Sequence, residues 1–376
     1  MSKTPAANDC RESTRSLEAL DMALRSALLA WYARERRDLP WRRTRDPYAI
    51  WVSETMLQQT RVETARPYWE RFVRELPTVQ SLAEAPESRV LALWSGLGYY
   101  RRARMMHAAA RRVVAEHGGR LPAEAEALRS LEGVGAYTAG AIASIAFGRR
   151  VALVDGNVAR VLARWFAVTD DVKSAGGSAR TWRLAERLVE GLAPGQEPGD
   201  WNQALMELGA TVCTPRDPAC GGCPVAALCE AHRRGIASEL PRVAKKRQPA
   251  TQQRVAIVLS SGRALLLARR RSDALFGGLW EPPSAEDGLP ALAARLGVDA
   301  NELRAAGHVV HVLSHRRLRV DVAHGPLGAR RRWALPGPDY EEVRVVPLRE
   351  LGERAHSTLA RKILRMANVP IGGVRS

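Results

Sequence analysis

The sequence of 376 residues contains no uncharged apolar run near the roughly 20 residues that a membrane-spanning helix needs. Its first 15 residues are polar and lack the apolar centre of a secretory signal. Both absences favour a soluble cytoplasmic protein without a membrane partner. At roughly 150 residues per domain, the length suggests two or three domains.

Cysteine is also scarce, with five residues, of which four lie within 17 positions and Cys10 stands alone. This distribution excludes the disulfide framework of a small secreted protein. The four clustered residues have the spacing C-x6-C-x2-C-x5-C and are Cys213, Cys220, Cys223 and Cys229. Four thiolates at this density can hold either a zinc ion or an iron–sulfur cluster, and the spacing rules alone leave both open.

Negative charge is in short supply, because 40 Asp and Glu face 57 Lys and Arg, which gives a net charge of +17. An excess of this size indicates a polyanionic partner, most often nucleic acid. A genome that favours Arg codons is the alternative explanation. It accounts for part of the pattern, since lysine is confined to Lys3, Lys173, Lys245, Lys246 and Lys362.

The composition and hydrophobic periodicity of the sequence change along the chain. Residues 1–16 predict a flexible arm, and apolar residues then recur at the three- and four-residue spacing of helices as far as residue 232. Residues 233–253 are rich in Lys, Arg, Pro and Gly and predict an exposed basic linker. Residues 254–376 mix strand-like and helix-like segments, which predicts a second domain of α+β type.

Within the second domain, the sequence predicts two hairpins and two helices. Short apolar runs at 255–259 and 264–268 are separated by a turn-forming Ser-Ser-Gly-Arg stretch. A second hairpin is predicted for 308–313 and 318–323. Helices are predicted over 289–296 and 358–366.

Two carboxylates of the helical part have different predicted surroundings. Asp155 precedes an apolar-periodic segment as a helix N-cap would, and its neighbouring N–H groups should hold it ionised. Glu54 shares a helix face with Ile50, Trp51 and Leu57, so burial should raise its pKa. Each residue alone fits a purely structural role. Together, one protonated and one ionised carboxyl group are what acid-assisted cleavage of a glycosidic bond requires.

A glycine-rich stretch precedes another helical segment. Gly133 and Gly135 allow a tight turn that presents main-chain N–H groups at a helix N-terminus, where they can bind phosphate. An ordinary joint between two helices is the alternative. The whole stretch 131–140, however, resembles the helix-hairpin-helix motif. The cysteine spacing likewise resembles the [4Fe–4S] loop of endonuclease III-type DNA glycosylases.

Three further motifs resemble one branch of that superfamily, the adenine DNA glycosylases of the MutY type. They are Leu-Pro-Trp-Arg at 39–42, Trp-Val-Ser-Glu-Thr-Met-Leu-Gln-Gln-Thr at 51–60 and Gly-Leu-Gly-Tyr-Tyr at 96–100. The resemblance implies a multidomain chain, with an all-α helix-hairpin-helix glycosylase domain followed by an α+β Nudix-like domain. The helical domain, 17–232, would comprise a six-helix barrel at about 40–147 and a cluster subdomain made of 17–39 and 148–232. One structural [4Fe–4S] cluster would sit on the four clustered cysteines.

The resemblance also implies an activity, which is excision of adenine mispaired with 8-oxoguanine or guanine in duplex DNA. The enzyme would act as a monomer in base excision repair, at the bacterial nucleoid. Glu54 would protonate adenine N7 and Asp155 would face C1′, with Tyr137 and Asn157 assisting. Substrate and DNA contacts would come from Arg42, Gln59, Thr60, Leu97, Tyr99, Gly133, Gly135, Gln203, Ser314 and His315.

The lysine distribution bears on strand cleavage. Glycosylases that also act as lyases need a lysine amine for a Schiff base. In endonuclease III-like proteins that lysine lies in the hairpin, where this chain has Tyr137, and residues 4–172 contain no lysine. We therefore expect little or no lyase activity.

The C-terminal part agrees with the resemblance. Residues 276–283 resemble a Nudix-like domain, but the helix predicted over 289–296 carries only Arg295 as a charge. Hydrolytic Nudix proteins need a glutamate-rich helix for divalent metal, so pyrophosphatase activity is not expected. Ser314 and His315 match the family's 8-oxoguanine recognition loop, with Leu313 where Phe is common.

Two alternatives remain open at this point. A related glycosylase for another mismatch, such as one acting on thymine, would leave the C-terminal domain without a role. A non-catalytic iron–sulfur DNA-binding protein would leave the pair Glu54 and Asp155 without one.

Overall fold

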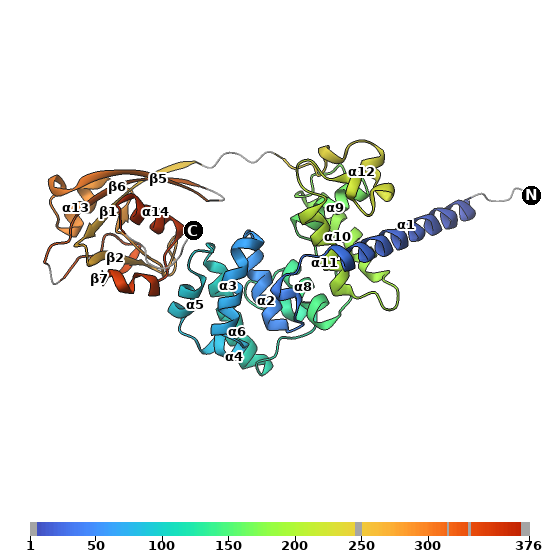
Figure 1. Cartoon of the computed structure of the whole chain (residues 1–376), viewed down its shortest axis with the longest axis horizontal. Helices are drawn as coiled ribbons and strands as arrows, with labels where there is room; N and C mark the ends of the chain where they lie inside the picture. The colour runs from blue at the N-terminus through green and yellow to red at the C-terminus, as the bar shows by residue number, and fades with distance from the viewer. Residues whose placement is uncertain (1–5, 245–249, 314–315, 330–331, 370–376) are drawn as a thin grey trace, which may run out of the picture. The chain divides into compact units, whose positions relative to one another are not determined.

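The computed structural model describes residues 6–244, 250–313, 316–329 and 332–369. The chain forms two compact units, one made of residues 1–80 and 108–245 and the other of residues 81–107 and 246–376 (Figure 1).

Every described element of the first unit is helical, which confirms the all-α prediction. Its α-helices are α1 (Ala6–Glu35), α2 (Pro47–Leu57), α3 (Val62–Glu75), α7 (Ala125–Arg129), α8 (Ala136–Phe147), α9 (Gly156–Trp165), α10 (Ala175–Glu190), α11 (Pro198–Thr211) and α12 (Glu230–Arg233). Its 3₁₀ helices are η1 (Pro40–Arg42), η2 (Cys220–Gly222), η3 (Ala226–Leu228) and η4 (Ala237–Glu239). Helices α4 (Val79–Glu84) and α6 (Arg101–His117) extend across the division, and α5 (Glu87–Trp94) belongs to the second unit.

The boundaries differ from the sequence prediction at three places. Residues 81–107, predicted as part of the helical domain, group with the C-terminal unit, because buried hydrogen bonds join Ser95 and Tyr100 to His356. Helix α1 begins at Ala6, inside the predicted flexible arm. The segment predicted as linker is ordered at both ends, since Ala244 N–H donates to Asp171 Oδ2 at 3.0 Å and strand β1 begins at Thr251. These tertiary contacts extend the folded units into a segment whose basic composition suggested exposure.

Local sequence explains where the central helices begin. Asp46 caps α2 by accepting hydrogen bonds from the N–H groups of Tyr48 and Ala49. Residues 48–56 are then buried without interruption, so α2 is a core helix. Gly135 stands at the N-cap of α8, and the Asp155 side chain caps α9. Helix α2 packs on α8, and α11 packs on both α8 and α9, which brings the starts of α8 and α9 to one region.

The second unit is built around a seven-stranded mixed sheet with the order β3-β2-β1-β6-β5, with β4 paired to β1 and β7 to β2. Strands β1 and β6 are parallel, and the other described pairs are antiparallel. The strands are β1 (Thr251–Ser260), β2 (Ala264–Arg270), β3 (Trp280–Glu281), β4 (Ser284–Ala285), β5 (Arg304–Val312), β6 (Arg317–Pro326) and β7 (Tyr340–Pro347). Besides α5 and the parts of α4 and α6 that it includes, the helical elements of this unit are α13 (Leu289–Leu296), η5 (Ala300–Glu302), η6 (Leu348–Glu353) and α14 (Thr358–Met366).

Both predicted hairpins and both predicted helices of this domain are confirmed. Alternate residues of β1 face opposite sides of the sheet, as the strand period of two requires. Ile257 and Leu259 pack in the cluster that contains α13, whereas Ala256 and Val258 pack in the cluster that contains α14. The sheet is therefore covered on both faces.

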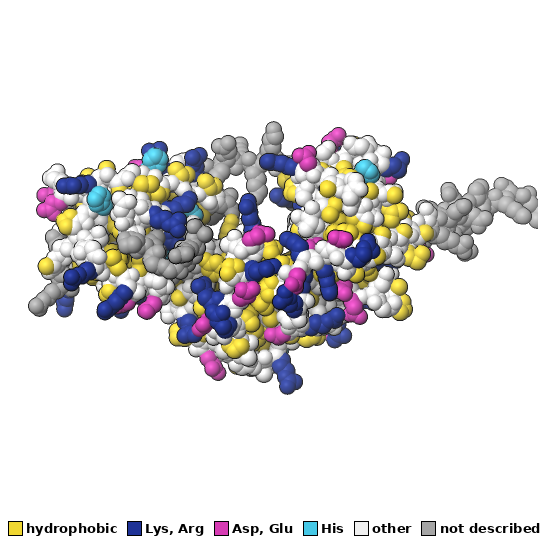
Figure 2. Space-filling model, in the orientation of Figure 1, with side chains coloured by type: hydrophobic (Ala, Val, Ile, Leu, Met, Phe, Trp, Pro, Cys, Tyr) yellow, Lys and Arg dark blue, Asp and Glu magenta, His cyan; other side chains and the backbone are white. Residues whose placement is uncertain are grey.

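The exposed surface is rich in arginine, and Figure 2 shows Lys and Arg side chains spread over the visible face of both units. Within the described residues, no helix combines the length and apolarity that crossing a membrane demands.

Candidate active site and cysteine loop

Glu54 of α2 and Tyr137 of α8 form the centre of a buried site. Glu54 is only 5% exposed, and its Oε2 accepts a hydrogen bond of 2.5 Å from the Tyr137 hydroxyl. Burial raises the pKa of Glu54 to about 7, with the negative charge of Asp155 adding to the rise and the Tyr137 hydrogen bond opposing it. The carboxyl group is thus poised to hold or release a proton near neutral pH.

Asp155 caps α9 as predicted. Its Oδ1 accepts from the Val158 N–H at 2.7 Å, and its Oδ2 accepts from Asn157 Nδ2 at 3.0 Å. The predicted direction of its pKa is wrong, however. Burial raises the pKa of Asp155, and the hydrogen bonds from Val158 and Asn157 only partly offset that rise. The N-cap position was visible in the sequence, but the depth of burial was not.

A hydrogen-bond chain links Asp155 to the cysteine loop through residues that the sequence analysis did not single out. Arg160 Nη2 donates to Asn157 Oδ1 at 2.9 Å, and its Nε donates to the main-chain oxygen of Cys213 at 2.7 Å. Close packing supports the chain, because a Cβ on Gly209 would lie 2.6 Å from Asn157 Cβ. The sequence signal for Arg160 was its place one turn after Asn157 on the same helix.

Glu207 of α11 is a second residue that the sequence analysis missed. Its carboxylate, 1% exposed, forms salt bridges of 2.8 Å with both Arg37 and Arg42. Burial alone would raise the pKa of Glu207, but hydrogen bonds from the two arginines outweigh it and lower the pKa to about 2. Glu207 therefore fixes the direction of Arg42. Its position one turn after Gln203 could have suggested a shared helix face.

These side chains line one cavity of about 170 Å³. Seven residues predicted from the sequence meet there: Arg42, Glu54, Thr60, Tyr137, Asp155, Asn157 and Gln203. Its remaining walls come from Arg37, Leu39, Trp41, Leu57, Val62, Met206, Glu207 and Ala210. Two buried carboxyl groups and several hydrogen-bonding groups thus surround a space with partly apolar walls, which suits a small ligand with polar edges.

Four of the predicted DNA-contact residues have a positive φ angle or stand at a helix N-cap. Gly133 has φ of +79°, which favours glycine, and Gly135 begins α8 without a side-chain cap, so main-chain N–H groups remain for a phosphate. Gln59 and Tyr99 are non-glycine residues with positive φ, +58° and +49°. Such strained conformations concentrate at functional sites. Leu97, by contrast, is buried.

Ser314 and His315 lie outside the described residues. The strands that flank them are described, since β5 ends at Val312 and β6 begins at Arg317.

The four clustered cysteines are free thiols that line one small cavity of about 20 Å³ together with Arg164 and Trp165. Arg164 is buried, and its Nη1 lies 3.2 Å from Cys213 Sγ. Burial raises the pKa of Cys223 to about 11 and also raises that of Cys229, and the other cysteines of the loop add to both rises. Among the described residues, no three His, Cys, Asp or Glu side chains are placed to hold a single metal ion. Four thiols around one cavity beside a buried guanidinium suit a thiolate-bound cluster instead, because cation and metal both favour the thiolate form.

Three stretches of the chain match models of known protein families. Residues 52–187 match the HhH-GPD superfamily of base excision DNA repair proteins. Residues 213–229 match the iron–sulfur binding domain of endonuclease III, and residues 254–366 match the NUDIX domain.

Whole-chain relatives narrow the assignment. The adenine DNA glycosylase of Rattus norvegicus is 39% identical over an alignment of 409 positions, which covers 92% of this chain and 78% of that protein. The chain belongs to the adenine DNA glycosylase family. The Homo sapiens adenine DNA glycosylase is 41% identical over 365 residues, covering 80% of this chain and 66% of the human protein.

A solved structure supports the helical fold of this family member. A thermostable thymine-DNA glycosylase superposes with a TM-score of 0.51 at 32% identity, covering 58% of this chain and 99% of that one. Along the chain, the iron–sulfur match thus follows the HhH-GPD match, and the NUDIX match follows both.

Proposed function

We propose that this protein is a monofunctional glycosylase that removes adenine mispaired with 8-oxoguanine or guanine in duplex DNA, acting as a monomer. The observation that carries the proposal is the buried Glu54, with a pKa of about 7, in one cavity with Asp155. An adenine buried in a duplex cannot reach such a site, so the nucleotide must be extruded from the stack.

Glu54 supplies the proton. Protonated at neutral pH in a substantial fraction of molecules, it donates to adenine N7, and the bond between C1′ and N9 then breaks with its electron pair moving to the base. Asp155 stabilises the positive charge that develops at C1′. A water oxygen bonds to C1′ and releases a proton, which restores Glu54. Asn157, which donates to Asp155, keeps that carboxylate oriented.

Arg42 and Gln203 would recognise the extruded base, since both line the cavity. The Gln203 amide can both donate and accept hydrogen bonds, as the edge of adenine requires. Glu207 holds the Arg42 guanidinium in place through its 2.8 Å salt bridge, so the recognition groups are ordered before the base arrives.

The assignment as monofunctional rests on Tyr137, whose hydroxyl bonds to Glu54 in the place where a lyase would hold an amine. Lys173 does not line this cavity. It lines a neighbouring one that also includes Asp155. Borohydride trapping of enzyme on an abasic duplex therefore tests the point, because a Schiff base to Lys173 would give a covalent adduct that Lys173→Ala lacks.

The cofactor would be one [4Fe–4S] cluster held by Cys213, Cys220, Cys223 and Cys229. It would brace the loop that contacts Arg160 and would take no part in the hydrolysis, which transfers no electron.

The Nudix-like domain would recognise 8-oxoguanine through Ser314 and His315, which lie in the sequence between the last residue of β5 and the first of β6. Two features argue against pyrophosphatase activity in this domain. Arg295 is the one charged residue of α13 and is paired with Asp287. Glu281 is already paired in a buried salt bridge with Arg270.

A duplex panel tests the whole proposal. Single-turnover assays on adenine–8-oxoguanine, adenine–guanine and thymine–guanine duplexes, with and without alkali, should give alkali-dependent breaks at adenine only. Release of thymine would support the alternative glycosylase. No base release from protein that binds the duplexes would support a non-catalytic DNA-binding protein.

A further inference from the structure

The segment between α5 and α6 is tied to the C-terminal part of the same unit by buried hydrogen bonds. The Tyr100 hydroxyl donates to the main-chain oxygen of His356 at 2.5 Å, and the His356 N–H donates to Ser95 Oγ at 3.1 Å. Arg361 of α14 adds contacts from Nη2 to Ser95 O and Oγ at 3.1 and 3.0 Å. Ser95, Tyr100 and His356 are all buried, so water does not compete for these bonds.

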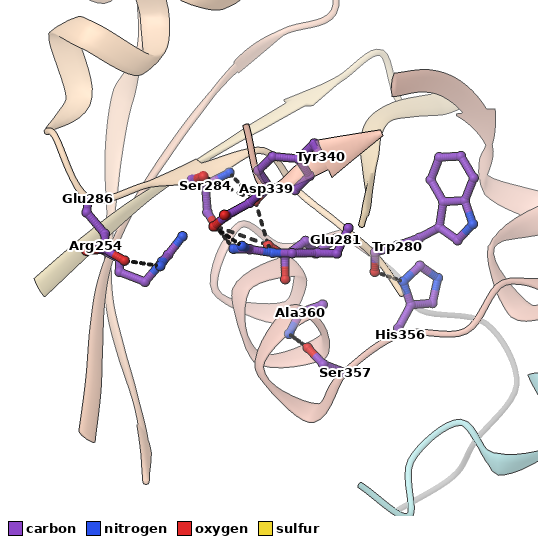
Figure 3. Close-up of polar contacts among 11 residues, drawn as sticks. Arg254, Trp280, Glu281, Ser284, Glu286, Asp339, Tyr340, His356, Ser357 and Ala360 are labelled. Carbon is purple, nitrogen blue, oxygen red and sulfur yellow. Dashed lines mark hydrogen bonds and ion pairs between the residues drawn. The ribbon is translucent and has the colours of Figure 1, made fainter. Parts of the chain in front are cut away.

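His356 is itself anchored on its own side. Its ring nitrogens lie 2.8 Å from the Trp280 oxygen and 3.0 Å from the Leu351 oxygen, and Figure 3 shows the ring directed at Trp280. The next residue, Ser357, caps α14 by accepting from the Ala360 N–H at 2.9 Å. The main-chain groups that meet Ser95 and Tyr100 therefore belong to a rigid part of the domain.

The tied segment presents one exposed aromatic ring. Tyr99 is 49% exposed and has φ of +49°, a conformation that costs free energy in a non-glycine residue. The Arg102 guanidinium lies 5.3 Å from the Tyr99 ring centroid and 5.5 Å from that of Trp94. The Tyr100 hydroxyl also accepts from the Gly96 N–H at 3.0 Å, which fixes the start of the loop.

We propose that Tyr100 and His356 are positioning residues through which the Nudix-like domain holds Tyr99 outward, ready to stack on a base of duplex DNA. This inference rests on the proposed function. Any base offers a π face to an aromatic ring, and a loop ordered beforehand loses less conformational entropy on binding. The domain thus contributes to duplex recognition through a contact that does not touch DNA.

The test compares two tyrosine-to-phenylalanine variants of the full chain. Tyr100→Phe removes the hydroxyl that meets His356 and Gly96. Tyr48→Phe is the matched control, because its buried hydroxyl donates to the Leu76 oxygen at 2.8 Å within the first unit. Affinity is measured on an adenine–8-oxoguanine duplex whose adenosine carries a 2′-fluorine that blocks excision. We expect the Kd to rise about three- to tenfold for Tyr100→Phe and less than twofold for Tyr48→Phe.

A double-mutant cycle with Tyr99→Ala separates positioning from general stability. If Tyr100 acts through Tyr99, then Tyr100→Phe causes no further loss of affinity in the Tyr99→Ala background. An equal loss in both backgrounds overturns the inference. If Tyr100→Phe does not fold, Arg361→Met removes the α14 contact to Ser95 and carries the same expectation.

The outcomes also separate this inference from the proposed function. Wild-type protein that binds the mispaired duplex and excises its adenine no better than with a fully paired duplex contradicts the proposed function. Wild-type protein that prefers the mispair, together with a Tyr100→Phe variant that behaves like Tyr48→Phe, contradicts the positioning role alone.

Discussion

Each unit of the molecule buries a glutamate against a tyrosine hydroxyl, and the two pairs differ in one respect. In the helical unit the Tyr137 hydroxyl donates to Glu54 at 2.5 Å. In the Nudix-like domain the Tyr340 hydroxyl donates to Glu281 at 2.6 Å. Glu281 also forms a 2.8 Å salt bridge with Arg270, with both side chains only 2% exposed. No salt bridge to Glu54 occurs among the described residues.

Burial without a salt bridge among the described residues explains why the pKa of Glu54 is high. A buried carboxyl group without a paired cation favours its protonated form, and the pKa of Glu54 accordingly rises to about 7. In the other pair, Glu281 and its neighbours raise the pKa of Arg270 although burial alone would lower it, so the guanidinium stays charged and the ion pair serves structure. Similar carboxyl–phenol contacts thus fit the acid catalysis proposed for Glu54 in one unit and a structural ion pair in the other.

The largest expected effect comes from exchanging the two glutamates for glutamine. Glu54→Gln should slow single-turnover excision about 10²–10⁴-fold, because the amide cannot donate a catalytic proton, while duplex affinity changes little. Glu281→Gln should leave the excision rate of folded protein within about threefold. Glu63→Gln, at an exposed position of α3, is the matched control. A Glu54→Gln variant that excises adenine within threefold of the wild-type rate would show that Glu54 is not the acid.

The second prediction concerns Arg270, the cation that is paired with Glu281 in the Nudix-like domain. Arg270→Met leaves Glu281 buried without its cation and should lower the free energy of unfolding of the Nudix-like domain by about 3–5 kcal/mol. Arg270→Met combined with Glu281→Leu should recover much of that loss, since both charges are then removed. Urea unfolding of the wild type, the single variant and the double variant measures both values. Equal stability of the single and double variants would mean that the ion pair is not what matters.

Sequence patterns predicted the local features of both units. The N-cap at Asp155, the buried face that holds Glu54 and the ranges of α13 and α14 follow from periodicity and capping, which depend on neighbouring residues. The seven predicted residues that share the cavity came mostly from resemblance to a family rather than from spacing.

What the sequence could not predict depends on contacts between distant segments. Glu207 meets Arg37 and Arg42 across 170 and 165 positions, so no local pattern reports the pairing. The predicted direction of the pKa shift of Asp155 was wrong for the same reason, because the burial of Asp155 depends on how α9 packs among other helices. Glu281 carried no sign of its ion pair because Arg270 lies on a neighbouring strand.

The third prediction concerns stability. Glu54 has a folded pKa of about 7, above its usual 4.5, so the folded state binds more protons than the unfolded state between those values. Stability should therefore fall as pH rises from about 4.5 to 7 and stay reduced above that. Glu54→Gln removes the dependence and should stabilise the first unit by up to about 3 kcal/mol at pH 8, with little effect at pH 4.5. Thermal unfolding of both proteins at pH 4.5 and pH 8 measures this. A Glu54→Gln variant that stabilises the protein equally at the two pH values would contradict the prediction.

The smallest expected effect is a shift in a pH profile. Because the proposed mechanism requires protonated Glu54, we expect the single-turnover rate to decline as pH rises through about 7. The Tyr137 hydrogen bond lowers the pKa of Glu54, because it stabilises the carboxylate more than the acid. Tyr137→Phe should therefore move the decline to higher pH by roughly half to one unit, the equivalent of one buried hydrogen bond.

Tyr340→Phe is the control for that shift, since it removes the matching hydroxyl from Glu281 and should leave the midpoint of the decline unchanged. The midpoint is the informative quantity, because Tyr137→Phe can also lower the plateau rate by disturbing the cavity. A midpoint that stays in place or moves to lower pH in Tyr137→Phe would mean that the titrating acid is not the group bonded to Tyr137. The proposed role of Glu54 as the catalytic acid would then fail, whereas the Glu281–Arg270 ion pair would be unaffected.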